Sequence, residues 1–225
     1  MDYSKAIVKS SASIANIAKE TDLGTRIPSC PDWTVGDLVF HLASVQRFWA
    51  AAVRERNPQV SPHLDDSDVD DAELVVWARD QTDALVNALT IASGAPCWTW
   101  WGEPRTASAV ARHQVQEAAV HCWDIYNALG QDFEIPTDQA ADGIAEFLEV
   151  QSSTMEMPAD RHFSFQAIDG ADVITYGDLS LPPISLHGAA SDIVLVMNKR
   201  RPLEVLRVDG DVTIVQRWLD ALDLT

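Results

Sequence analysis

The 225-residue sequence has few cysteines and few basic residues. Its three cysteines, Cys30, Cys97 and Cys122, lie far apart and form no Cys-x-x-Cys pair. That pattern excludes the disulfide framework of a small secreted protein and fits a reducing compartment. Lysine and arginine total 16 against 34 aspartates and glutamates, a formal net charge of −18. Because nucleic acids and anionic membrane surfaces both attract basic side chains, this charge argues against either as a partner.

Long apolar runs are also missing. The first 20 residues hold no apolar signal core, and no segment reaches the roughly 18 continuous apolar residues of a membrane span. The sequence has no GxGxxG after a predicted strand and no GxxxxGK[ST], GxSxG or HExxH motif, so nucleotide binding and serine hydrolysis lack support. We therefore expect a cytoplasmic protein.

Helical periodicity dominates the first two-thirds of the chain. Thr34 is a good N-cap, and Asp37 occupies the position that closes a capping box. After it, apolar side chains recur at helical spacing on one face, which indicates an amphipathic helix packed in a core. Similar patterns predict five helices in all, which begin near residues 3, 34, 70, 106 and 137.

The pattern changes after about residue 155. The segments "HFSFQAI" and "ADVITYG" have strand composition and are joined by an Asp-Gly turn signal. We predict further strands over "ISLHG" and "LEVLRV", and helices over "AASDIVLVMNKR" and "DVTIVQRWLDAL". The sequence therefore predicts an α+β protein with a helical domain over residues 1–155 and a small α+β domain over residues 156–225.

The segment "HQVQEAAVHCWD" carries the strongest chemical signal. Glu117 and His121 lie four positions apart and so point the same way from a helix. His41 lies within the apolar face of the helix after Thr34, and a buried imidazole needs a partner for each nitrogen. These three side chains are either the ligands of a metal or a solvated pair and a hydrogen-bonded core histidine. Spacing alone does not decide between the two interpretations.

Several neighbouring residues are open to two interpretations. Asp124, one turn after His121, is either a hydrogen-bond acceptor for a ligand or a solvated carboxylate. His113 could extend the cluster or lie in solvent, and Cys30 could be a reactive thiol or a small apolar filler. Four tryptophans could line a pocket or pack in the core: Trp33, Trp98, Trp100 and Trp101.

Three segments resemble one known family. "RIPSCPDWTVGDLVFHLASVQRFWAAAV" resembles the opening of the mycothiol-dependent maleylpyruvate isomerase family, in which a Pro-x-Cys-Pro-x-Trp-Thr-Val loop precedes a His-Leu pair. "EAAVHCWDIYNALG" is similar to the family's Glu-x-x-x-His-x-Trp-Asp segment. "GAASDIVLVMNKRRPLEVLRVDGD" resembles, more loosely, its C-terminal domain. The resemblance covers nearly the whole chain.

The resemblance implies a DinB-like four-helix bundle followed by a sterol-carrier-like C-terminal domain. It also implies that His41, Glu117 and His121 bind a divalent metal, expected to be Zn²⁺, with room for mycothiol or a similar thiol. Arg200 matches a basic residue with which the family is expected to hold an anionic substrate. Asn198 and Lys199 replace the usual neighbours of that arginine, so the substrate specificity can differ.

Three functions follow from these observations. The first is a metal- and thiol-dependent enzyme, either a cis–trans isomerase or a thiol S-transferase. The second is a non-catalytic protein that binds a small ligand and carries a structural or regulatory metal, and the third is a zinc-responsive partner protein. Structural zinc usually takes four protein ligands, so a set of three favours the enzyme.

Overall fold

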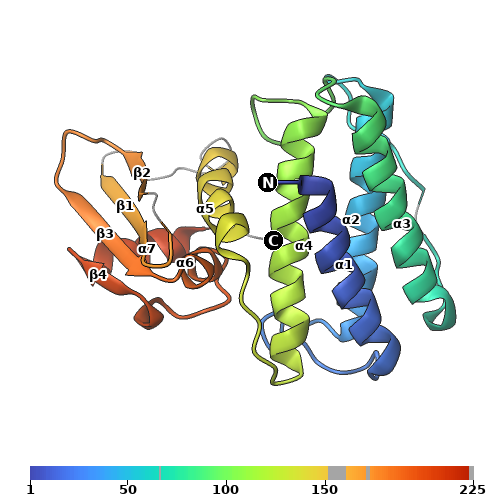
Figure 1. Ribbon diagram of the computed structural model, residues 1–225, viewed down its shortest axis with the longest axis horizontal. Helices are drawn as coiled ribbons and strands as arrows, with labels where there is room; N and C mark the ends of the chain where they lie inside the picture. The colour runs from blue at the N-terminus through green and yellow to red at the C-terminus, as the bar shows by residue number, and fades with distance from the viewer. Residues whose placement is uncertain (66, 152–160, 171–172, 223–225) are drawn as a thin grey trace. The chain divides into compact units, whose positions relative to one another are not determined.

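The computed structural model describes residues 1–65, 67–151, 161–170 and 173–222 (Figure 1). Its contacts divide the chain into two compact units, Met1–Phe133 and Glu134–Thr225. The boundary expected between residues 155 and 156 lies outside the described residues. The observed division comes earlier because helix α5 (Thr137–Gln151) packs on helix α6 (Ala190–Met197) of the second unit.

The first unit is a bundle of four helices, as the family resemblance implies (Figure 1). Helix α2 packs mainly on α3, and α1 packs on α4 and α3. Aliphatic side chains of all four helices form one core cluster, which includes Ile14, Leu38, Leu42, Leu74 and Ile125. The helices are α1 (Tyr3–Glu20), α2 (Val35–Glu55), α3 (Asp71–Ala92) and α4 (Ala107–Ala128).

A capping box fixes the start of α2. The hydroxyl of Thr34 accepts the backbone N–H of Asp37 at 3.2 Å, and the Asp37 carboxylate accepts the backbone N–H of Thr34 at 2.8 Å. The preceding loop folds back on itself, because Ile27 N–H donates to the carbonyl of Trp33 and Trp33 N–H donates to that of Cys30. Loop and cap together fix Cys30 and Trp33 beside the first turns of α2.

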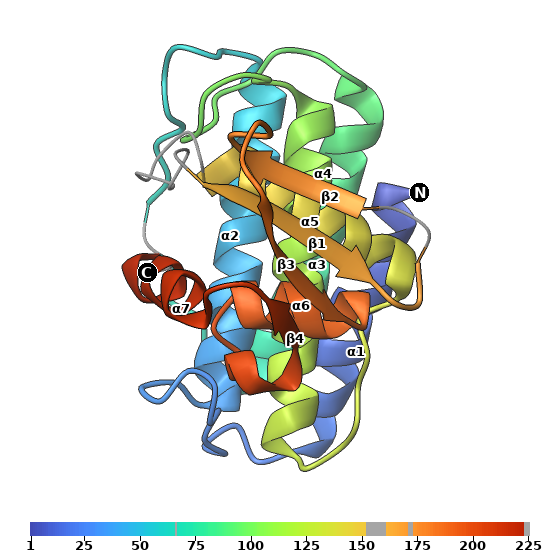
Figure 2. The same cartoon turned by 90° about the vertical axis from the view of Figure 1, so that its left-hand side faces the viewer.

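The second unit contains a four-stranded mixed sheet in the order β2-β1-β3-β4 (Figure 2). Strands β1 and β3 are parallel, and the other two pairings are antiparallel. This unit is the predicted α+β domain, with α5 added. Its strands are β1 (His162–Ala167), β2 (Val173–Gly177), β3 (Pro183–Gly188) and β4 (Arg207–Asp209), and its last helix is α7 (Val212–Ala221). The first two residues predicted for β2, 171 and 172, lie outside the described residues.

The strand predicted over residues 203–208 is wrong in its first half. Leu203–Val205 form a 3₁₀ helix, η1, and only Arg207–Asp209 pair as β4. Leu203 and Leu206 are both buried, a spacing of three residues that matches one 3₁₀ turn rather than the alternation of a strand. The backbone N–H of Leu206 closes this turn on the carbonyl of Leu203 at 3.0 Å.

Three aromatic side chains join sheet and helix in the second unit. Phe163 and Phe165 point to the same face of β1, and both rings contact Trp218 of α7.

In neither unit does a described helix have the length and apolar composition needed to cross a membrane.

Candidate metal centre

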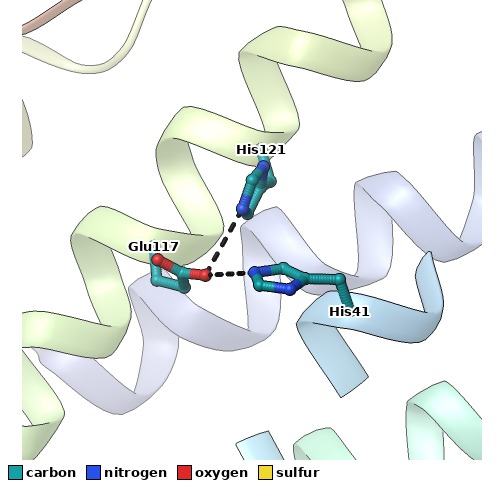
Figure 3. Close-up of side chains that lie close together, drawn as sticks. All are labelled: His41, Glu117 and His121. Atoms are coloured by element: carbon teal, nitrogen blue, oxygen red, sulfur yellow. Dashed lines mark hydrogen bonds and ion pairs between the residues drawn. The ribbon is translucent and has the colours of Figure 1, made fainter. Parts of the chain in front are cut away.

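Three potential metal-ligating side chains converge between α2 and α4 (Figure 3). Glu117 and His121 come from successive turns of α4, and His41 comes from α2. The Nε2 atom of His41 lies 3.0 Å from Oε1 of Glu117, and Nε2 of His121 lies 3.3 Å from the same oxygen. One donor atom from each residue lies within 4.8 Å of the others, and within the described ranges this is the one group of three or more such residues.

The two separations that involve Glu117 suit a small divalent cation. Zinc binds nitrogen and oxygen at about 2.0–2.2 Å, which puts the ligand atoms of a tetrahedral site about 3.3 Å apart. The two nitrogen–oxygen separations, 3.0 and 3.3 Å, are close to that value. Two imidazoles and one carboxylate also leave a coordination position open for a further ligand.

Exposure increases steadily across the three side chains. The His121 side chain is 7% exposed, that of Glu117 is 23% exposed and that of His41 is 36% exposed. The cluster is therefore closed around His121 and open around His41. A small molecule would reach the three donor atoms from the side of His41 and Glu117.

Glu117 and His121 form an ion pair, with 3.3 Å between Oε1 and Nε2. Burial alone would raise the pKa of the Glu117 carboxyl, but the charge of His121 and the hydrogen bonds to His121 and His41 hold it well below its usual range. Burial alone would lower the pKa of His121, but Glu117 and Asp124 raise that pKa to about 9. A metal would have to displace the proton of His121, because a ligating imidazole needs a free lone pair.

Asp124 contacts the far side of the His121 ring. Its side chain is fully buried, so the interpretation as a solvated carboxylate is wrong. The Nδ1–H of His121 donates to Oδ2 of Asp124 at 2.9 Å, and the Cys30 thiol donates to the same oxygen at 3.9 Å. With Nδ1 protonated, Nε2 is the nitrogen that faces Glu117 and His41. The sequence gives no sign of the Cys30 contact, because the two residues lie 94 positions apart.

One of the four tryptophans that could line a pocket, Trp33, packs against two of the three ligand side chains. Its ring centroid is 4.6 Å from that of His41 and 5.7 Å from that of His121. His113 does not join the ligands, because its ring packs among tryptophan rings, with Trp101 at 4.9 Å. Cys122 is buried and burial raises its thiol pKa to about 12, which fits a core residue that points away from the ligands.

Arg200 lies in the turn after α6, in the second unit. Its backbone N–H donates to the carbonyl of Leu195 at 2.8 Å, and its guanidinium donates to the carbonyl of Asn198 at 3.0 Å. The guanidinium of the neighbouring Arg201 forms an ion pair with Asp192. Arg200 is half-buried, and its contact with a substrate stays a prediction.

Comparisons with known proteins agree with this architecture. The family model described as mycothiol maleylpyruvate isomerase N-terminal domain matches residues 5–126. Two solved structures, of the mycothiol-dependent maleylpyruvate isomerase and of a histidine-to-alanine mutant of it, share the fold, each with a TM-score of 0.70 at 12% identity over 92% of both chains. No curated protein matches the sequence. Because the family model spans more than half of the chain and includes His41, Glu117 and His121, the chain belongs to the mycothiol maleylpyruvate isomerase family.

Proposed function

We propose that the protein is a metal- and thiol-dependent enzyme, either a maleylpyruvate isomerase-like cis–trans isomerase or a thiol S-transferase. Its thiol is mycothiol or a similar low-molecular-weight thiol. The observation that carries this proposal is the convergence of three donor atoms from His41, Glu117 and His121 within 4.8 Å of one another. The family match and the shared fold support it.

The ligand set suits catalysis better than a structural role. When bound, zinc would lower the pKa of a thiol and favour its thiolate form. His41, Glu117 and His121 would hold the ion and leave one position open, whereas structural zinc usually has four protein ligands. The partial exposure of His41 and Glu117 gives the thiol a path to that position.

Both candidate reactions begin with the same nucleophile. In isomerisation, the thiolate sulfur forms a bond to one carbon of the cis double bond, and the electron pair moves onto the conjugated carbonyl. Rotation about the new single bond follows, and expulsion of the sulfur restores the double bond in the trans form and frees the thiolate. In S-transfer, the new C–S bond remains and a leaving group departs with its electron pair. The site would suit either reaction, so the identity of the substrate would determine which of the two occurs.

The chain's own residues prepare the site for this chemistry. Asp124 holds the Nδ1–H of His121, so that Nε2 is directed to the ligand cluster. Trp33 packs against both imidazoles and shields one side of them from water. A negatively charged substrate is repelled by the net charge of −18, so a local guanidinium is needed to bind it, and Arg200 is the proposed one.

The first prediction tests the function itself. Zinc-loaded protein should bind mycothiol in a calorimetric titration, and it should isomerise maleylpyruvate or transfer the thiol to an electrophile. Removal of zinc by a chelator should abolish both properties, and added zinc should restore them. Stoichiometric zinc without thiol binding would instead favour the non-catalytic metal protein.

The second prediction concerns the ligands. His41→Ala, Glu117→Ala and His121→Ala should each lose most of the bound metal in elemental analysis, because two remaining ligands bind zinc weakly. His63→Ala is the matched control, since His63 is exposed in a loop of the same unit and its loss should leave the metal content unchanged. Full metal content in one of the three variants would remove that residue from the site.

The third prediction concerns Asp124. Asp124→Asn should lower the zinc affinity by about 10- to 100-fold, because the amide no longer fixes the protonation of His121 Nδ1 as a carboxylate does. Zinc affinity is measured by competition with a chromophoric chelator, and circular dichroism checks the fold. The exposed Asp132 provides the control Asp132→Asn. Equal affinities in the two variants would rule out this role for Asp124.

The fourth prediction concerns Arg200. Arg200→Gln should keep its metal but raise the KM for a carboxylate substrate at least tenfold, equivalent to about 1.4 kcal/mol of binding free energy. Arg201→Gln is the neighbouring control, because the ion pair with Asp192 already occupies that guanidinium. Steady-state kinetics separate KM from kcat, and an unchanged KM in Arg200→Gln would contradict the assignment.

A further inference from the structure

A second cluster of side chains comes from the two helices that carry the metal ligands and from the loop before α4. It is built from one phenylalanine, four tryptophans and one histidine, half of the chain's eight tryptophans among them. We name it the aromatic cluster, and its residues are Phe48, Trp49, Trp98, Trp100, Trp101 and His113. None of these residues has a role in the function proposed above.

The aromatic cluster continues the face on which the ligands lie. On α2, Phe48 follows His41 by seven residues, which is about 10 Å along the helix axis and returns to the same side. On α4, His113 precedes Glu117 by four residues, about 6 Å along the axis and again on the same side. The aromatic cluster therefore lies one to two helical turns from the open edge of the metal site.

Within the aromatic cluster, buried rings pack beneath the exposed ring of Trp100. Trp49 and Trp101 are each 3% exposed, and their ring centroids lie 5.2 Å apart. Trp100 packs against Trp101 at 5.3 Å and against His113 at 5.8 Å, yet it is 41% exposed. The exposed indole of Trp100 presents a large apolar surface to solvent. Its contacts with Trp101 and His113 set its orientation.

Hydrogen bonds hold the loop that carries Trp100. Cys97 N–H donates to the carbonyl of Arg105 at 3.0 Å, which closes the loop at its base. Within the loop, the Thr99 hydroxyl donates to the carbonyl of Trp101 at 3.0 Å, and the Trp101 indole N–H donates to that of Pro104 at 3.3 Å. These hydrogen bonds fix the loop on both sides of Trp100, so ordering the loop would cost a ligand little binding free energy.

We propose that the aromatic cluster binds the carbohydrate part of the thiol cofactor and so selects mycothiol over simpler thiols. This inference rests on the proposed function. Mycothiol carries its thiol on a cysteinyl group that an amide joins to an amino sugar, which in turn bears a cyclitol. With the sulfur at the metal site, these two rings extend along the helices toward Trp100 and His113.

The chemistry of the two partners matches. The faces of a sugar ring present C–H groups, which pack on the electron-rich face of an indole, while the hydroxyl groups at the ring edge remain hydrated or hydrogen-bonded. The carbohydrate rings carry no charge, so the net charge of −18 does not oppose their approach. An aromatic surface is a means of recognition that this acidic chain can use without additional basic residues.

The test compares two thiols on the zinc-loaded full chain. Mycothiol and N-acetylcysteine share the thiol, but only mycothiol has the carbohydrate. Calorimetric titration should show that Trp100→Ala raises the Kd for mycothiol at least tenfold and leaves the Kd for N-acetylcysteine within twofold of the wild-type value. Trp77→Ala is the matched control, because Trp77 is a half-buried tryptophan stacked on Phe40, away from the aromatic cluster. It should change neither Kd.

Two further results separate the ways in which the inference can fail. If the wild-type protein binds neither thiol, the proposed function fails and this inference fails with it. If it binds both thiols equally well, or if Trp100→Ala weakens both equally, the carbohydrate site is refuted while the thiol-dependent function stands. Phe48→Ala provides a second variant on the rigid helix α2, and it should reproduce the selective loss for mycothiol.

Discussion

The carboxylate shared by two imidazoles is the interaction on which the first unit depends. Oε1 of Glu117 lies 3.0 Å from Nε2 of His41 and 3.3 Å from Nε2 of His121, and the Glu117 side chain is only 23% exposed. A carboxylate left unpaired in such a place would cost several kcal/mol. The protonated His121 offsets that cost, and a divalent cation held by the same three side chains would offset it as well.

That arrangement in turn depends on how the helices begin and pack. His41 lies in the second turn of α2, so the capping box of Thr34 and Asp37 sets the position from which its side chain extends. On α4, the helical repeat alone aligns Glu117 and His121. The two helices then need only one correct packing distance to bring all three donor atoms together.

Features that depend on local spacing were predictable from the sequence, and features that depend on long-range contacts were not. The pairing of Glu117 with His121 follows from helical periodicity, and the apolar faces predict the helices, whereas their number in the bundle came only from the family resemblance. The sequence does not show that Asp124 is buried or that Cys30 reaches it, because these contacts join segments 94 residues apart. It also placed α5 with the preceding helices, since an amphipathic pattern does not reveal which partner covers its apolar face.

The ligand cluster alone cannot explain selectivity. A metal held by two imidazoles and one carboxylate would bind the sulfur of almost any thiol, because it would contact the sulfur and not the rest of the molecule. Discrimination among thiols would therefore require contacts beyond the sulfur, and the aromatic cluster, formed by residues of both ligand-bearing helices and the loop before α4, could supply them. The ligand side chains are most exposed at His41 and least at His121, so a thiol bound there would leave the cluster on the side of His41 and Glu117. His113 lies one turn from Glu117 along α4, which brings the proposed carbohydrate site close to that side.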